Sequence, residues 1–329
     1  MDSQKYLQQI TAALEKAVET SRGDDKGWVA DYIPELTNVN TNYVSACIQL
    51  SDGEQLCSGD SPNYRFTLQS VSKLVLLTGL IEEFGPDRVF SWIKAEPSGQ
   101  PFAAIGHLDR YGPVPSNPLI NAGAICLSGR IPGNPQEQLE WVENWTTRLF
   151  NGALTFSQAV YDSEFSSADR NRSLAYLMKS TGVITRDVEE VLVPYLTLCS
   201  YEVNIQQAAY LPMLLANGGL TPQGKRIISE QTSNRVVSIM ATCGLYDESG
   251  SHLVHIGLPA KSGVSGLIVA VATGRGGVAV MSPLLNTKGT SIRGHFILSE
   301  LSKALGWHFA TPWGYARIDS MLHRNDDYY

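Results

Sequence analysis

The order of strand-like and helical segments constrains the fold of this chain most strongly. Strand-like runs lie near both ends, at 44–50, 54–58, 252–256, 266–273 and 277–282, and the last three are rich in Val and Ile. Between them helical patterns alternate with Pro- and Gly-rich loops. This order predicts an α+β protein in which both chain ends build one antiparallel sheet flanked by helices. We expect one domain (1–329), with 1–84 and 247–329 in a sheet lobe and 85–246 in an inserted all-helical lobe.

Composition and charge exclude several classes of protein. The 329 residues carry a net charge of −7, which argues against a broad nucleic-acid surface. The chain has no run of about 18 apolar residues and no apolar signal-peptide core near Met1, so we expect no membrane segment. The cysteines are scattered and form no Cys-x-x-Cys pair, which favours small buried side chains at Cys47, Cys57, Cys126, Cys199 and Cys243. Together these features predict a cytoplasmic protein.

Neither a metal ion nor an organic cofactor is indicated. His252 and His255 lie three residues apart on a predicted strand, so they would face opposite sides of it and could not share a metal. The glycine-rich segment 274–277 joins two predicted strands, and a hairpin explains it better than a dinucleotide-binding loop. We therefore expect no metal and no cofactor.

A buried helix after residue 66 carries two polar groups at its start. The segment is almost entirely apolar up to Phe84 and ends at Gly85-Pro86, a pattern typical of a helix C-terminus. Ser70 and Lys73 are three residues apart and are therefore neighbours on one helix face. Burial lowers the pKa of a lysine, and a neutral lysine can take the proton of a serine. The pair is a candidate nucleophile and base.

A second motif, Lys261-Ser262-Gly263, supports this interpretation. A Ser-x-x-Lys segment followed later by Lys-Ser/Thr-Gly is the pairing found in serine β-lactamases and penicillin-binding proteins, where the later motif lies on a strand at the edge of the site. The two motifs in this order favour acyl transfer. The sequence alone does not rank Lys73 and Lys261 as the working base.

The chain resembles the serine-dependent glutaminases, in their bacterial-type form with a single catalytic domain of the β-lactamase/DD-peptidase-like fold. The resemblance extends over about residues 31 to 293. It rests on short motifs at 31–34, 69–73, 117–125, 169–171, 199–203, 215–219 and 257–266.

The resemblance implies a role for each matching position. It makes Ser70 the nucleophile, Lys73 its base and Tyr246 a proton relay, with the backbone N–H groups of Ser70 and Val264 as the oxyanion hole. Lys261 and Ser262 would support them. The implied substrate-binding residues are Tyr32, Gln69, Ser70, Asn121, Glu164, Asn171, Tyr195, Tyr246 and Val264. Glu164 would accept from an ammonium group, although the nearby Asp162 could take that role; the amides and tyrosine hydroxyls would donate to a carboxylate.

The implied activity is hydrolysis of L-glutamine to L-glutamate and ammonia through a Ser-Lys acyl-enzyme, with no nucleic acid or membrane as partner. The family also implies a homodimer or homotetramer. One alternative is a penicillin-recognising serine hydrolase, which would be labelled by a β-lactam and would carry a signal peptide. The other is a non-catalytic glutamine-binding protein on the same fold, which would have a broken Ser-Lys pair.

Overall fold

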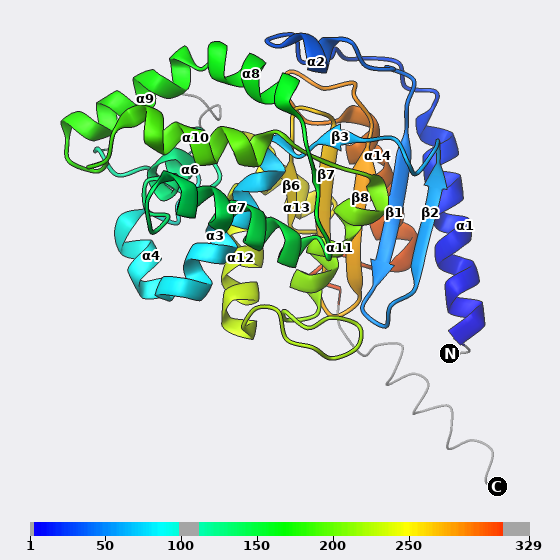
Figure 1. The fold of residues 1–329 in the computed structure, drawn as a ribbon. Helices are drawn as coiled ribbons and strands as arrows, with labels where there is room; N and C mark the ends of the chain where they lie inside the picture. The colour runs from blue at the N-terminus through cyan, green and yellow to red at the C-terminus, as the bar shows by residue number, and fades with distance from the viewer. Residues whose placement is uncertain (1–2, 99–111, 312–329) are drawn as a thin grey trace, which may run out of the picture.

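A five-stranded antiparallel sheet forms the centre of the computed structural model, which describes residues 3–98 and 112–311 (Figure 1). Its order is β2-β1-β8-β7-β6. The strands are β1 (Ser45–Leu50), β2 (Gln55–Gly59), β6 (Ala260–Ser262), β7 (Leu267–Ala272) and β8 (Gly276–Met281). β1 pairs with β8 along its whole length, so the two ends of the chain meet within the sheet. The prediction of one antiparallel sheet built from both chain ends is confirmed.

Helices cover both faces of this sheet. α1 (Ser3–Ser21) and α14 (Ile292–Leu305) pack on one face, where Leu14 and Leu301 join Ile48 of β1 in one apolar cluster. α11 (Ile205–Ala216) lies across the other face. Its backbone approaches β8 so closely that a Cβ atom at Gly277 would lie 2.1 Å from the backbone nitrogen of Met213. Only glycine leaves room for this contact.

The other large helices gather beside the β6 edge of the sheet (Figure 1). At their centre lies α3 (Lys73–Phe84), which is buried from Lys73 to Ile81, as its apolar sequence predicts. It ends as predicted at Gly85, whose φ is 76°, before Pro86. Around it lie α4 (Pro86–Trp92), α6 (Asn121–Ser128), α7 (Pro135–Leu149), α8 (Gln158–Ser166), α9 (Asp169–Ser180), α10 (Val188–Cys199) and α12 (Glu230–Cys243), with the short α2 (Pro34–Thr37) above the sheet.

A second, small sheet joins the nucleophile segment to the helices. It has the order β3-β5-β4, with β3 (Phe66–Thr67), β4 (Thr155–Phe156) and β5 (Tyr201–Val203). The sequence predicts a short strand near β3 but none within the helical range. The backbone N–H of Leu68 donates to Tyr201 O at 2.8 Å. The chain entering Ser70 is therefore fixed to β5, which follows α10.

The predicted strand at 252–256 is wrong, because this segment lies in α13 (Ser249–His255). Ser249, His252 and Ile256 are buried at steps of three and four residues, whereas Val254 is 70% exposed. That burial has the period of a helix, although the Val and Ile residues suggest a strand. Within residues 3–98 and 112–311, no group of three or more His, Cys, Asp or Glu side chains could hold a metal ion.

The interpretation of the cysteines is wrong for one pair. Cys47 on β1 lies directly opposite Cys57 on β2, and the two form a disulfide. The spacing along the sequence did not reveal this pairing, because it depends on strand register. Cys126, Cys199 and Cys243 are free and buried, as predicted. Disulfides are typical of oxidising compartments, so cysteine content no longer supports the cytoplasmic location, which stays a prediction.

Two further points concern organisation. Among the described helices, none combines the length and apolar character needed to cross a membrane. The division into a sheet lobe (1–84 and 247–329) and a helical lobe (85–246) stays a prediction. One helix does not follow it, because α11 lies in the helical range and yet packs on the sheet.

Candidate active site

Ser70 lies in η1 (Gln69–Ser72), a short 3₁₀ helix between β3 and α3. The sequence places Ser70 at the start of the α-helix, whereas in the structure the α-helix begins at Lys73. Gln69 has a φ of 45°, in the left-handed region. Non-glycine residues rarely take this conformation, and those that do cluster at functional sites. The unusual backbone at Gln69 turns the chain just before the serine.

Lys73 contacts the Ser70 hydroxyl directly. Its Nζ donates to Ser70 Oγ at 3.0 Å and to Asn121 Oδ1 at 2.7 Å. Burial lowers the pKa of Lys73 to about 8, while the charge of Glu164 acts in the opposite direction. At this pKa about a tenth of the Lys73 amine is neutral at pH 7. Ser72 faces elsewhere and donates to Gln69 O at 2.7 Å, so it is not paired with this lysine.

Tyr246 also contacts Ser70 and lies in the 3₁₀ helix η2 (Tyr246–Glu248). It is a second buried residue with left-handed backbone, at a φ of 57°. Lys261 Nζ donates to the Tyr246 hydroxyl at 3.2 Å and to Ser262 O at 2.6 Å. Burial raises the pKa of Tyr246 to about 12, and contact with the Ser70 hydroxyl partly offsets this shift. Burial and the charge of Lys73 lower the pKa of Lys261.

Lys261-Ser262-Gly263 lies on and just after β6, the edge strand next to η1. A Cβ atom on Gly263 would lie 2.8 Å from Leu68 O and 3.6 Å from the Ser70 backbone nitrogen. In the part of the chain that the structure describes, neither the Ser70 nor the Val264 N–H donates to a backbone carbonyl. These are the two N–H groups predicted for the oxyanion hole.

A Gly263→Ala substitution is expected to lower kcat by about 10²–10³-fold, the usual effect of losing one oxyanion donor. The added methyl group would push the Val264 peptide away from Ser70, since Leu68 O is backbone and cannot rotate aside. Steady-state kinetics on the wild type and variant measure the effect. Gly250→Ala is the matched control, because a Cβ atom there meets open space. Equal kcat values in the wild type and both variants would contradict the placement of the oxyanion hole at the Ser70 and Val264 N–H groups.

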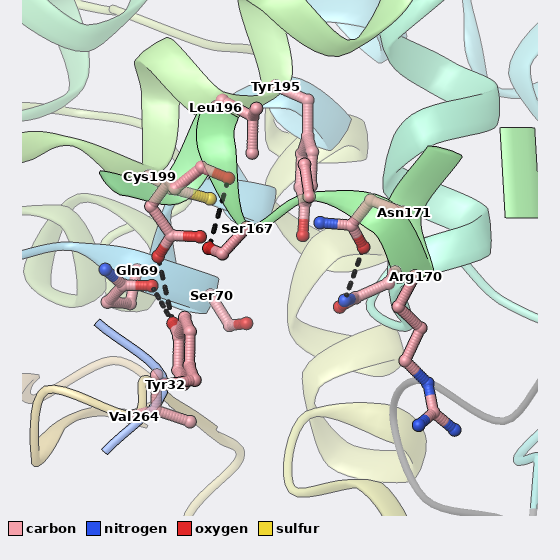
Figure 2. A pocket seen from close by; sticks show the side chains of 13 residues that line it. Tyr32, Gln69, Ser70, Ser167, Arg170, Asn171, Tyr195, Leu196, Cys199 and Val264 are labelled. Atoms are coloured by element: carbon pink, nitrogen blue, oxygen red, sulfur yellow. Dashed lines mark hydrogen bonds between the residues drawn. The ribbon is translucent and has the colours of Figure 1, made fainter. Parts of the chain in front are cut away.

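The Ser70 hydroxyl opens into a cavity of about 230 Å³, small enough to suit a small molecule (Figure 2). On one wall the Tyr32 hydroxyl donates to Glu164 Oε1 at 2.9 Å and contacts Gln69 Oε1 at 3.1 Å. Glu164 is 7% exposed, and burial raises its pKa. Asp162 is exposed and accepts from a neighbouring glutamine outside the cavity, so Glu164 is the carboxylate that faces the cavity.

The opposite wall carries the amides and Tyr195 (Figure 2). Asn121 Nδ2 donates to Asn171 Oδ1 at 3.1 Å, while Asn121 Oδ1 accepts from Lys73. Among the residues that the structure describes, the Nδ2 group of Asn171 has no acceptor, so it can donate to a bound molecule. The Tyr195 side chain, from α10, ends beside this amide.

The structure brings all of the predicted site residues into one region. Ser70, Tyr32, Gln69, Asn121, Glu164, Asn171, Tyr195 and Val264 line the cavity, while Lys73, Tyr246, Lys261 and Ser262 lie behind Ser70. The other lining residues, to which the sequence gave no role at the site, are Ser167, Ala168, Arg170, Leu196 and Cys199. Arg170 and Cys199 lie within the motifs at 169–171 and 199–203, whereas no motif contains the other three. The Arg170 guanidinium points away from Ser70 (Figure 2).

The sheet, the adjoining helices and the Ser-x-x-Lys segment between them are those of an α+β protein of the β-lactamase-like class. The glutaminase family model matches residues 27–309. The chain is 49% identical to a glutaminase of Legionella pneumophila, over 91% of this chain and 97% of that protein. It is 41% identical to a glutaminase of Clostridium tetani, over 90% of this chain and 98% of that protein.

Solved structures of glutaminases also resemble this chain. The probable glutaminase YbaS superposes with a TM-score of 0.90 at 33% identity, over 95% of this chain and all of that chain. The Bacillus subtilis glutaminase YbgJ, in a covalent complex with 5-oxo-L-norleucine, superposes with a TM-score of 0.81 at 30% identity, over 91% of this chain and 98% of that chain. This chain therefore belongs to the glutaminase family and is a glutaminase.

Proposed function

We propose that this chain hydrolyses the side-chain amide of L-glutamine through an acyl-enzyme on Ser70, with Lys73 as the base. The observation that carries the proposal is the 3.0 Å contact between Lys73 Nζ and Ser70 Oγ, at a lysine whose pKa is lowered to about 8 by burial. The covalent complex of the related Bacillus subtilis enzyme with 5-oxo-L-norleucine supports a covalent intermediate. No metal or organic cofactor takes part in this scheme.

In the first step, neutral Lys73 takes the Ser70 proton and Ser70 Oγ attacks the amide carbon. The oxyanion accepts hydrogen bonds from the Ser70 and Val264 N–H groups. The carbon–nitrogen bond then breaks, and the leaving nitrogen takes a proton from Tyr246, which Lys261 can replace through its 3.2 Å hydrogen bond. Ammonia leaves, and a glutamyl ester remains on Ser70.

In the second step, water hydrolyses the ester by the reverse route. A water molecule in the position of the departed ammonia gives a proton to the same groups and attacks the ester carbon. The carbon–Ser70 Oγ bond breaks, and Ser70 Oγ regains its proton from Lys73. Glutamate is released, and the enzyme returns to its starting protonation state.

The two walls of the cavity recognise the two ends of an amino acid. Glu164 accepts from the substrate ammonium group. The Asn171 amide and the Tyr195 hydroxyl donate to the substrate carboxylate. For Tyr32 we revise the role implied by the resemblance: its hydroxyl already contacts Glu164 and Gln69, so it holds the ammonium-binding carboxylate in position rather than binding the substrate carboxylate.

The pH dependence of glutamine hydrolysis should follow Lys73. At a pKa of about 8, only about a tenth of the lysine is neutral at pH 7, so kcat/KM should rise about tenfold per pH unit below pH 8 and level off above it. Initial rates of ammonia release between pH 6 and 10 measure this profile. A rate that is constant from pH 6 to 9 would contradict Lys73 as the base.

A Glu164→Gln substitution should lower kcat/KM for glutamine by about 10–100-fold, mainly through KM. A hydrogen bond to a charged group contributes about 1.5–3 kcal/mol, and the amide cannot replace the charge. Asp162→Gln is the control at the alternative carboxylate and should stay close to wild type, since Asp162 lies outside the cavity. A stronger effect at Asp162 than at Glu164 would reverse the assignment.

Ammonia release from L-glutamine, measured beside L-asparagine, tests the function itself. We expect turnover of glutamine. No turnover of either amide, combined with covalent labelling by a β-lactam, would favour a penicillin-recognising hydrolase; no turnover and no labelling would favour a glutamine-binding protein. We also propose a homodimer or homotetramer, which sedimentation equilibrium of the purified protein measures directly.

A further inference from the structure

A second cavity, of about 400 Å³, adjoins the substrate cavity on the far side of Tyr246. Tyr32 and Val264 line both cavities, Ser70 lines only the first, and Tyr246 lines only the second. The two cavities therefore meet at Tyr32 and Val264, and Tyr246 of the second cavity contacts Ser70 of the first.

Tyr246 connects the second cavity to the atom that leaves in the proposed reaction. In that scheme the amino acid occupies the first cavity, between Glu164 and Asn171, and Tyr246 gives a proton to the leaving nitrogen. A larger substituent in place of a hydrogen on that nitrogen would extend past Tyr246 into the space between Trp28 and Lys288. Ammonia alone does not need a space of this size.

The lining of the second cavity has a definite chemistry. Its charged residues are Asp31, Asp247 and Lys288. Lys288 forms an ion pair with Asp247, whereas Asp31 has no hydrogen bond or ion pair within the described segments 3–98 and 112–311. The indole of Trp28 is 51% exposed beside it. One unpaired carboxylate and an open aromatic face suit a cation.

We propose that this second cavity receives the amine half of N-substituted γ-glutamyl amides, and that it prefers amines carrying a second, positively charged ammonium group. The proposal rests on the proposed function. The chemistry is the same as for glutamine: the bond from Ser70 Oγ to the amide carbon forms, the carbon–nitrogen bond breaks, and the amine leaves with a proton from Tyr246. Water then releases glutamate.

The mono-γ-glutamyl amide of 1,4-diaminobutane and the γ-glutamyl amide of butylamine test this preference, because the two differ in the distal ammonium group. Glutamate release by the wild type should have a kcat/KM about 5–10-fold higher for the charged amide, as expected for one partly exposed ion pair plus one cation–π contact. Asp31→Asn should reduce this ratio to about 2–5, the part that the cation–π contact with Trp28 supplies, and leave glutamine turnover unchanged. Asp87→Asn, an exposed carboxylate on α4 away from both cavities, is the control and should keep the wild-type ratio.

Each other outcome has a distinct meaning. Glutamine turnover with no release from either substituted amide would overturn the second cavity as an amine site. An Asp31→Asn ratio equal to wild type would overturn the role of its charge. Turnover of the substituted amides without turnover of glutamine would overturn the proposed function and support the second cavity as an amine site. No turnover of any of the three compounds would overturn both.

Discussion

Ser70→Ala is expected to reduce kcat for glutamine hydrolysis by on the order of 10⁴-fold or more. The variant removes the only atom proposed to bond to the amide carbon, and loss of a nucleophile that acts together with its base removes nearly all the benefit of both. Ammonia release under saturating glutamine measures the loss. Substrate binding should remain, because Glu164 and Asn171 are untouched.

Ser72→Ala and Ser262→Ala are the controls for this result. Ser72 Oγ donates to Gln69 O and contacts Cys199 Sγ at 3.8 Å, and the buried Ser262 Oγ has no hydrogen-bond partner in the segments that the structure describes. Both should keep far more activity than Ser70→Ala. Near-wild-type turnover by a folded Ser70→Ala protein, with loss of turnover in either control, would move the nucleophile to that serine.

Lys73→Ala is expected to lower kcat by about 10³-fold, within the range for loss of a general base. Its Nζ lies 3.0 Å from Ser70 Oγ and, when neutral, can accept the serine proton. The rate that remains should also lose its dependence on pH around pH 8. Single-turnover measurements on the wild type and Lys73→Ala separate the loss in the chemical step from any change in substrate binding.

Lys261→Ala distinguishes the two buried lysines. Lys261 bonds to Tyr246 and to Ser262 O, so its hydrogen-bonded path to Ser70 runs through the tyrosine. Its loss should lower kcat less than loss of Lys73 and should leave the rise of activity toward pH 8 in place. A larger loss at Lys261, with Lys73→Ala close to wild type, would exchange the roles of the two residues.

Much of the fold was predictable because its signals are local. The apolar run of α3 and its stop at Gly85 are contained within one segment, and β7 and β8 flank a turn that joins them. The chain order of strands and helices then predicted the shared sheet. The 252–256 segment was misread because its Val and Ile content outweighed the helical spacing of its buried residues.

Other features depend on contacts between distant segments, and no local pattern reports them. The Cys47–Cys57 disulfide follows from the register of β1 and β2. Gln69 has a left-handed backbone although its residue type does not favour it. Tyr32 was placed at the site by resemblance, but its position against Glu164 required the fold.

The candidate site also combines local features, which the sequence predicted, with features that depend on contacts between distant segments. The pairing of Ser70 with Lys73 is set by helical spacing, so the sequence predicted it. Asn121, Glu164 and Asn171 come from three separate helices, and only the resemblance identified them. The second cavity was not predicted, because it joins residues near Trp28 with residues near Lys288.

Covalent labelling by 6-diazo-5-oxo-L-norleucine, located by peptide mass spectrometry, tests the central claim most directly. The reagent carries the carbon skeleton of glutamine and reacts with the related Bacillus subtilis enzyme. We predict one adduct per chain, on the peptide containing Ser70, that is prevented by excess glutamate and absent from Ser70→Ala. An adduct on Ser72, Ser262 or either lysine, with Ser70 unmodified, would contradict the Ser-Lys acyl-enzyme.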